Sequence, residues 1–174
     1  PKGQVTFEGR TAPIIYSSGD GGFHKHVLWV ARDITKRKEE EKKIEKLAYF
    51  DPLTNLPNRR LLTERLTHCI ERIKRSHETG ALLFLDIDRF KRINDTLGHH
   101  AGDELLIELA KRLSAIVGTS DTLARMGGDE FVVLLEYVGD DNNKAHSEAA
   151  AVAQKLHHVF DDKFQLCNTW QKIT

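Results

Sequence analysis

A pair of glycines followed by two acids separates two apolar segments in the last third of the chain. Residues 125–131 read Arg-Met-Gly-Gly-Asp-Glu-Phe, between Thr-Leu-Ala at 122–124 and the apolar run at 131–135. Short apolar runs joined by a glycine pair predict two antiparallel strands and a tight turn, with carboxylates at the start of the second strand. The chain must therefore build a sheet that contains this hairpin.

The same residues are also suited to binding an anion through a metal. Gly127 and Gly128 tolerate positive φ and let the backbone approach a bulky phosphate closely. The adjacent acids Asp129 and Glu130 suit a divalent cation that neutralises phosphate. An ordinary glycine hairpin with solvated acids would have the same sequence, so this motif needs support from the rest of the chain.

The charge balance and cysteine content exclude several classes of protein. The 174 residues include 26 Lys+Arg and 26 Asp+Glu. A net charge of zero argues against non-specific nucleic-acid binding, which needs a basic surface. No apolar run is long enough to span a membrane and no signal peptide is present, so we expect a cytoplasmic segment. Cys69 and Cys167 have no metal-ligand spacing and are expected to be free thiols.

Three regions follow one another along the chain. Residues 1–33 alternate like β structure, with expected short strands at 5–7, 11–16 and 27–31 and a turn at 17–22. Residues 34–49 are highly charged good helix formers, typical of a solvated connector or of a short parallel coiled coil that pairs two chains. The absence of an initiator Met suggests that the chain is a fragment.

Residues 50–174 predict a mixed α/β (α+β) domain. Two prolines mark a structured loop at 51–60, in which Asn58 is a plausible helix N-cap. Helical stripes follow to about residue 77, at 90–97, at 105–116 and around 149–159. Residues 81–85 are apolar on both faces and predict a central buried strand, and residues 164–173 are expected to begin another strand.

A second polar group follows the predicted strand at 81–85. Asp86 closes this strand, and ligands gather at the carboxyl ends of strands in sheets connected by helices. Asp88 should share its face because strand side chains alternate, but we favour it as the N-cap of the next helix. Lys91 opens that helix, where the helix dipole and a cation both favour phosphate. Arg92 is better explained as a solvated charge.

Two polar residues are candidates for reading a base. Phe90, Asn94 and Leu97 share a helix face, which leaves Asn94 as an amide beside the core. Asp103 could cap a helix that starts at residue 104. Together, an amide and a carboxylate could instead read a guanine edge, since a carboxylate accepts from the ring N–H and exocyclic NH₂ that adenine does not present in the same way.

These motifs together resemble the GGDEF family of diguanylate cyclases. The resemblance rests on residues 51–59, 86–95, 98–103 and 125–131, and covers the chain from about Leu47. Residues 29–35 resemble the end of a PAS sensor domain. The implied organisation is the C-terminal part of a PAS domain at 1–33, a signalling helix at 34–49 and a GGDEF domain at 50–174. The implied fold is the nucleotide-cyclase palm, a ferredoxin-like βαββαβ sheet with flanking helices.

The resemblance implies condensation of two GTP molecules into cyclic di-GMP with release of pyrophosphate, in a homodimer that uses Mg²⁺ or Mn²⁺. It assigns the metal to Asp86, the Ile87 carbonyl, Asp129 and Glu130. It assigns guanine to Asn94 and Asp103, the phosphates to Phe90 and Lys91, and close backbone approach to Gly127 and Gly128. Catalysis is assigned to Asp129, Glu130 and Lys91.

The sequence departs from the family pattern in two places. Many members carry an Arg-x-x-Asp product-inhibition site, and here Gly118 replaces its Arg while Asp121 remains. The family continues with a further strand and a helix carrying basic phosphate contacts, so we expect the domain to be incomplete at its C-terminal end. Two other functions stay open: a GTP-binding module without turnover that regulates a neighbouring domain such as a phosphodiesterase, and a dimerisation relay.

Overall fold

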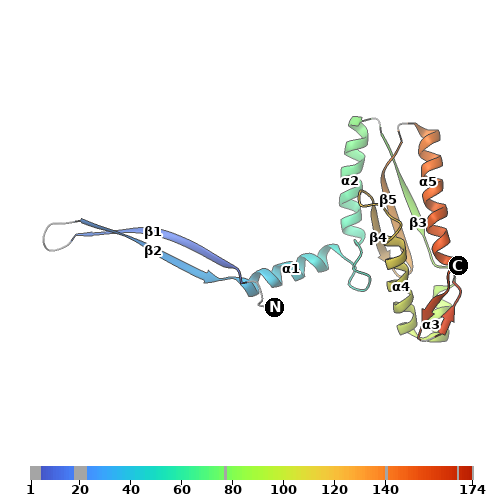
Figure 1. Cartoon of the computed structure of the whole chain (residues 1–174), viewed down its shortest axis with the longest axis horizontal. Coiled ribbons are helices and arrows are strands. Elements are labelled where there is room, and N and C mark those ends of the chain that lie inside the picture. Colours follow the sequence, from blue (N-terminus) through green and yellow to red (C-terminus); the bar gives the residue numbers. More distant parts are fainter. Residues whose placement is uncertain (1–4, 18–22, 77, 140, 168, 174) are drawn as a thin grey trace. The chain divides into compact units, whose positions relative to one another are not determined.

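The computed structural model of the chain (Figure 1) describes residues 5–17, 23–76, 78–139, 141–167 and 169–173. It forms two compact units, Pro1–Lys46 and Leu47–Thr174. Residues 18–22 of the expected turn lie outside the described residues. In the described part of the chain, no helix combines the length and apolar character needed to cross a bilayer.

The larger unit alternates helices with strands. Its elements are α2 (Arg59–Ser76), β3 (Thr79–Leu85), α3 (Phe90–Leu97), α4 (His99–Ser114), β4 (Thr122–Gly127), β5 (Glu130–Gly139), α5 (Asn142–His157), the 3₁₀ turn η1 (His158–Phe160), β6 (Phe164–Leu166) and β7 (Thr169–Gln171). Strands β3, β5 and β4 form an antiparallel sheet in that order, and β6 and β7 form a separate hairpin. This mixed α/β architecture confirms the predicted fold class.

Alternation along β5 places apolar side chains on both faces of the sheet. Val132 and Leu134 pack with α2 on one face, where Leu62 and Cys69 complete a small cluster. Phe131, Val133 and Leu135 point to the larger core on the other face. That core includes residues of α4 and α5, so helices cover both faces (Figure 1). Strand β5 therefore holds the domain together, and its first residues carry the predicted site.

Two local predictions were wrong, and one alternative is excluded. Strand β3 lies at the edge of the described sheet, with Phe84 77% exposed, and β5 is the central strand. Arg89, rather than Asp88, is the N-cap residue of α3, and no side chain caps it. Helix α4 starts directly after Gly98, so Asp103 lies inside the helix and caps nothing. Gly98 has φ 88° and ψ 159°, a positive φ that glycine adopts readily, and it is the single residue between α3 and α4.

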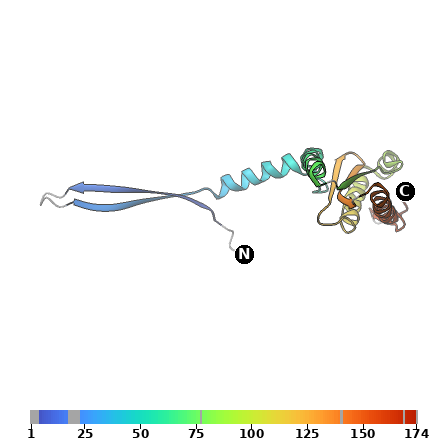
Figure 2. The ribbon, with the colours of Figure 1, turned by 90° about the horizontal axis from the view of Figure 1, so that it is seen from above.

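The smaller unit is a long hairpin followed by a helix. Strands β1 (Phe7–Ser17) and β2 (Phe23–Asp33) pair antiparallel along their whole length (Figure 2). The expected strands at 11–16 and 27–31 are thus parts of two longer strands, whereas Val5 and Thr6 precede β1. Helix α1 (Thr35–Tyr49) confirms the predicted charged helix and buries none of its residues.

Candidate functional site

The predicted acids meet where three strands end. Leu85 pairs with Phe131, and Gly127 pairs with Glu130, so the ends of β3 and β4 flank the start of β5. Asp86 follows β3 directly, while Asp129 precedes β5 and Glu130 opens it. The antiparallel register therefore gathers acids that are more than 40 residues apart in the sequence.

The turn between β4 and β5 needs its glycines for their backbone conformation. Gly127 has φ 136° and Gly128 has φ 53°, both in the region that disfavours residues with a Cβ. A Cβ on either glycine would meet no heavy atom within 4 Å. Both glycines are exposed, so the turn leaves open space for a ligand next to its backbone.

A buried arginine holds this turn in place. The Arg125 guanidinium donates from Nε and Nη2 to the Gly128 carbonyl, at 3.1 and 2.7 Å. Its Nη1 donates to both carboxylate oxygens of Asp51, at 3.0 and 2.9 Å. The backbone N–H of Arg125 also donates to the Pro57 carbonyl at 2.9 Å. The loop before α2 is thereby tied to the glycine turn.

The surroundings of Asp51 favour its ionised form. Burial acts to raise the pKa of Asp51, but hydrogen bonds from Thr54 and the Arg125 guanidinium outweigh it and hold that pKa below the usual value. Thr54 donates from both its backbone N–H and its hydroxyl, at 2.8 and 2.7 Å. The Asp51–Arg125 pair could not be predicted from the sequence, because 74 residues separate the partners.

The acids at the strand ends repel one another. Loss of solvation and the negative charge of Asp129 raise the pKa of Asp86, and Glu130 adds to the same effect. A divalent cation would relieve this repulsion, so the donor set fits Mg²⁺ or Mn²⁺. Among the described residues no three acidic, histidine or cysteine side chains form a ready-made metal cage. Mg²⁺ needs none, since one or two carboxylates commonly hold it together with substrate phosphates and water.

The loop from Asp86 to α3 places the predicted phosphate contacts. Ile87 turns its side chain into the core, where it is 2% exposed. Its carbonyl accepts from the Phe90 N–H at 3.2 Å and keeps a second lone pair for another partner. Phe90 packs against the core, whereas Lys91 is exposed at the first turn of α3. Arg89 and Arg92 beside it are exposed as well, so this end of α3 carries several cations.

The predicted base contacts come from neighbouring helices. Asn94 is half-buried on α3, and Asp103 is exposed on α4. Asn94 lies directly against Gly102, the residue before Asp103. The structure thus places Asn94 and Asp103 on adjoining parts of two packed helices.

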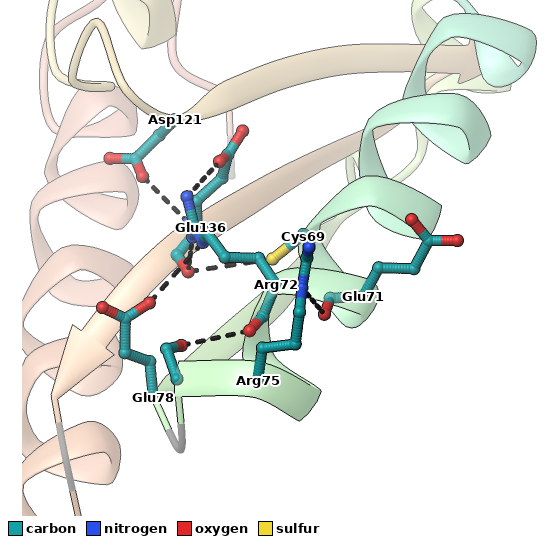
Figure 3. A network of polar contacts seen from close by, with 8 residues as sticks. Cys69, Glu71, Arg72, Arg75, Glu78, Asp121 and Glu136 are labelled. Carbon is teal, nitrogen blue, oxygen red and sulfur yellow. Dashed lines mark hydrogen bonds and ion pairs between the residues drawn. The ribbon is translucent and has the colours of Figure 1, made fainter.

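Asp121 takes part in a polar network at the opposite end of β4 (Figure 3). Its Oδ1 accepts from the Glu136 N–H at 3.1 Å. Arg72 of α2 donates from Nη2 to the Glu136 carbonyl at 2.6 Å and from Nη1 to its carboxylate at 2.9 Å. The buried Cys69 thiol lies 3.7 Å from the same carbonyl. These contacts join α2 to β5, and one Asp121 oxygen is already engaged.

Hollows border the strand ends. One of about 440 Å³ is lined by residues 82–85 of β3, by Asp86 and Asp88, and by residues of α5 and η1. Another of about 450 Å³ is lined by Gly127, Arg125 and the loop before α2. A hollow of about 570 Å³ near Trp170 contains none of the predicted site residues. One hollow thus lies beside Asp86 at the end of β3, and another lies beside the glycine turn.

Comparison with known proteins agrees with this geometry. The family model described as "Diguanylate cyclase, GGDEF domain" matches residues 48–174, which is more than half of the chain. The chain belongs to the GGDEF family. The matched span nearly coincides with the larger structural unit, Leu47–Thr174.

Two curated relatives and one solved structure illustrate the GGDEF match. The chain is 42% identical over 137 residues to the signaling protein YkoW of Bacillus subtilis, covering 79% of this chain. It is 46% identical over 120 residues to the bifunctional diguanylate cyclase/cyclic di-GMP phosphodiesterase MucR of Pseudomonas aeruginosa, covering 69% of this chain. It spans 17% of the length of either relative. The GGDEF domain of TpbB from Pseudomonas aeruginosa superposes with a TM-score of 0.67 at 35% identity, covering 72% of this chain and 71% of that one.

Proposed function

We propose that this GGDEF domain is a diguanylate cyclase, which joins two GTP molecules into cyclic di-GMP and releases two pyrophosphates. The observation that carries the proposal is the meeting of Asp86, Asp129 and Glu130 at the strand ends, beside a glycine turn open to a ligand. A cluster of mutually repelling acids is costly unless a cation or substrate compensates for it. The description of MucR as a diguanylate cyclase supports the same reaction.

Asp86, the Ile87 carbonyl, Asp129 and Glu130 would hold Mg²⁺ or Mn²⁺. When bound, such an ion lowers the pKa of a coordinated hydroxyl and neutralises a pyrophosphate leaving group. Lys91, at the start of α3, would stabilise negative charge on the phosphates. Phe90 would contribute its backbone on the same side.

The reaction forms two bonds, one from the ribose 3′-oxygen of each GTP to the α-phosphorus of the other. At each α-phosphorus the bond to the bridging oxygen breaks, and one pyrophosphate leaves with its electron pair. Asp129 is the candidate acceptor for the proton of the attacking hydroxyl. Asn94 and Asp103 would hold guanine, and Gly127 and Gly128 would let the backbone approach the nucleotide. The protein thus acts chiefly by positioning and by charge.

Each hairpin would hold one GTP, so chemistry requires two domains to face each other in a homodimer. Helix α1 could bring them together, since Ile44 and Leu47 are 68% and 67% exposed on an otherwise charged helix. A sparse apolar seam of this kind fits a short coiled coil with a second copy. The β1–β2 hairpin before it would be the end of a PAS sensor that adjusts the pairing.

A second candidate is a GTP-binding module without turnover that controls a neighbouring domain. The pairing of cyclase and phosphodiesterase activities in MucR favours this alternative. Such a module would bind GTP without needing all three acids at the strand ends.

Two measurements on the same samples separate the candidates. The 174-residue chain, and the same chain with any residues that flank it in its gene, are incubated with GTP and Mg²⁺. Nucleotide binding is measured by calorimetry, and products are separated by chromatography. Cyclic di-GMP that disappears in the Asp129→Ala variant supports the enzyme. GTP binding without product in either form supports the module and contradicts the cyclase.

A further inference from the structure

Gly102 occupies a position that glycine does not usually favour. It lies within α4 (His99–Ser114) and is buried. Glycine is less stable than alanine inside a helix because it loses more backbone freedom on folding. Its φ is not positive, so the backbone conformation does not explain it. The explanation has to lie in what surrounds its missing side chain.

Side chains of α3 fill the space that a Cβ would take. A Cβ built on Gly102 would overlap the Asn94 amide oxygen, and would lie 3.0 Å from Asn94 Cγ and 3.2 Å from the tip of the Phe90 ring. A short polar side chain can rotate away from such an overlap, whereas a ring packed against the core cannot move far. An alanine here would therefore displace Asn94 first and leave the fold largely intact.

No hydrogen bond fixes the Asn94 amide within the described part of the chain, although the residue is half-buried. Its backbone carbonyl accepts from the Gly98 N–H at 2.9 Å, which fixes the end of α3 but not the side chain. Contact with the bare backbone of Gly102 is thus what sets the amide orientation.

We infer that Gly102 is a positioning residue for base recognition: its missing side chain lets Asn94 lie against α4, next to Asp103, in the orientation that meets guanine. The inference rests on the proposed function. Gly102 itself touches no reacting atom. It acts through Asn94, so its substitution should weaken binding of the base and leave binding of the triphosphate unchanged.

A double-mutant cycle with two nucleotides tests the inference. Affinities for GTP and ATP are measured by calorimetry in the presence of Mg²⁺ for the unmodified chain, Gly102→Ala, Asn94→Ala and the double variant. Gly118→Ala is the control, because Gly118 also has ordinary φ and a Cβ there would lie 3.1 Å from Asp121 Oδ2, the oxygen that the Glu136 N–H does not use. Circular dichroism spectra check that each variant is folded.

We expect Gly102→Ala to weaken GTP binding about tenfold, which is the range of one lost hydrogen bond to a base. The affinity of Gly102→Ala for ATP should change less than twofold. The double variant should bind GTP within twofold of Asn94→Ala alone. Gly118→Ala should change neither. Equal losses for GTP and ATP, or a tenfold loss that persists without the Asn94 amide, would overturn the inference and leave the proposed function standing. An unmodified chain that binds no GTP would overturn both.

Discussion

Removal of the Arg125 guanidinium is the sharpest test of how this domain holds its glycine turn. The guanidinium bridges the Gly128 carbonyl and the Asp51 carboxylate through four donor contacts of 2.7–3.1 Å. Its side chain is 10% exposed and that of Asp51 is 15% exposed. Arg125→Met keeps most of the volume and removes every donor. It therefore isolates the polar contacts from the packing.

The expected loss of stability in Arg125→Met depends on the contacts that Asp51 and the Gly128 carbonyl keep. Loss of one partner from a buried ion pair costs roughly 3–5 kcal/mol. Asp51 keeps its two hydrogen bonds from Thr54, and the Gly128 carbonyl lies in an exposed turn that water can reach. We therefore expect a loss of about 2–3 kcal/mol, or a fall of about 8–12 °C in Tm for a domain of this size. Arg125→Lys should lose about half as much, because an ammonium cannot reach both partners as a planar fork does.

Urea unfolding measures the free energy directly. The chain has two tryptophans, Trp29 and Trp170, one in each structural unit. In a Trp29→Phe background, Trp170 fluorescence and far-ultraviolet circular dichroism follow the larger unit. Arg92→Met is the control, since Arg92 is exposed and its side chain makes no ion pair or hydrogen bond within the described part of the chain, so this variant should change little. A loss below about 1 kcal/mol for Arg125→Met would refute the reasoning that this arginine ties the turn to the loop.

Three further predictions concern pH, product binding and assembly. Because its folded pKa lies below 3.8, Asp51 should stabilise the fold fully above pH 3.8 and lose this contribution as the pH falls through the folded pKa; acid unfolding of Asp51→Asn should lack this loss. With Gly118 in place of a cation and one Asp121 oxygen engaged by the sheet, cyclic di-GMP should bind weakly without GTP, and micromolar or tighter binding by calorimetry would contradict this. Aspartate at both Ile44 and Leu47 should lower the dimer fraction in sedimentation experiments; an unchanged fraction would exclude the α1 seam.

The sequence was sufficient for the elements whose pattern is local. The glycine pair predicted the β4–β5 turn because only glycine readily adopts its positive φ values. Asn58 was correctly expected to cap α2, and its Oδ1 accepts from the Arg60 and Leu61 N–H groups at 2.9 and 3.1 Å. Both features depend on neighbouring residues alone, so spacing along the chain reveals them.

Features set by packing could not be predicted in the same way. Apolar residues on both faces suggested that β3 was central, but the described sheet places it at an edge, because strand order depends on partners far along the chain. Asp103 looked like a helix cap because acids favour that place, yet α4 begins four residues earlier at His99. The Asp51–Arg125 pair and the contact of Asn94 with Gly102 exist only once helices and strands have packed.

Metal-dependent turnover of GTP is the most direct test of the central claim that Asp86 and Asp129 form the reaction centre. Cyclic di-GMP is quantified by chromatography after incubation with GTP and Mg²⁺, with EDTA as the metal-free comparison. Asp95→Asn, which removes an exposed carboxylate of α3 outside the site, serves as the charge-matched control. We predict product from the unmodified protein and from Asp95→Asn, and a loss of at least a hundredfold in Asp86→Asn, in Asp129→Asn and with EDTA. Undiminished product from either site variant would contradict the account.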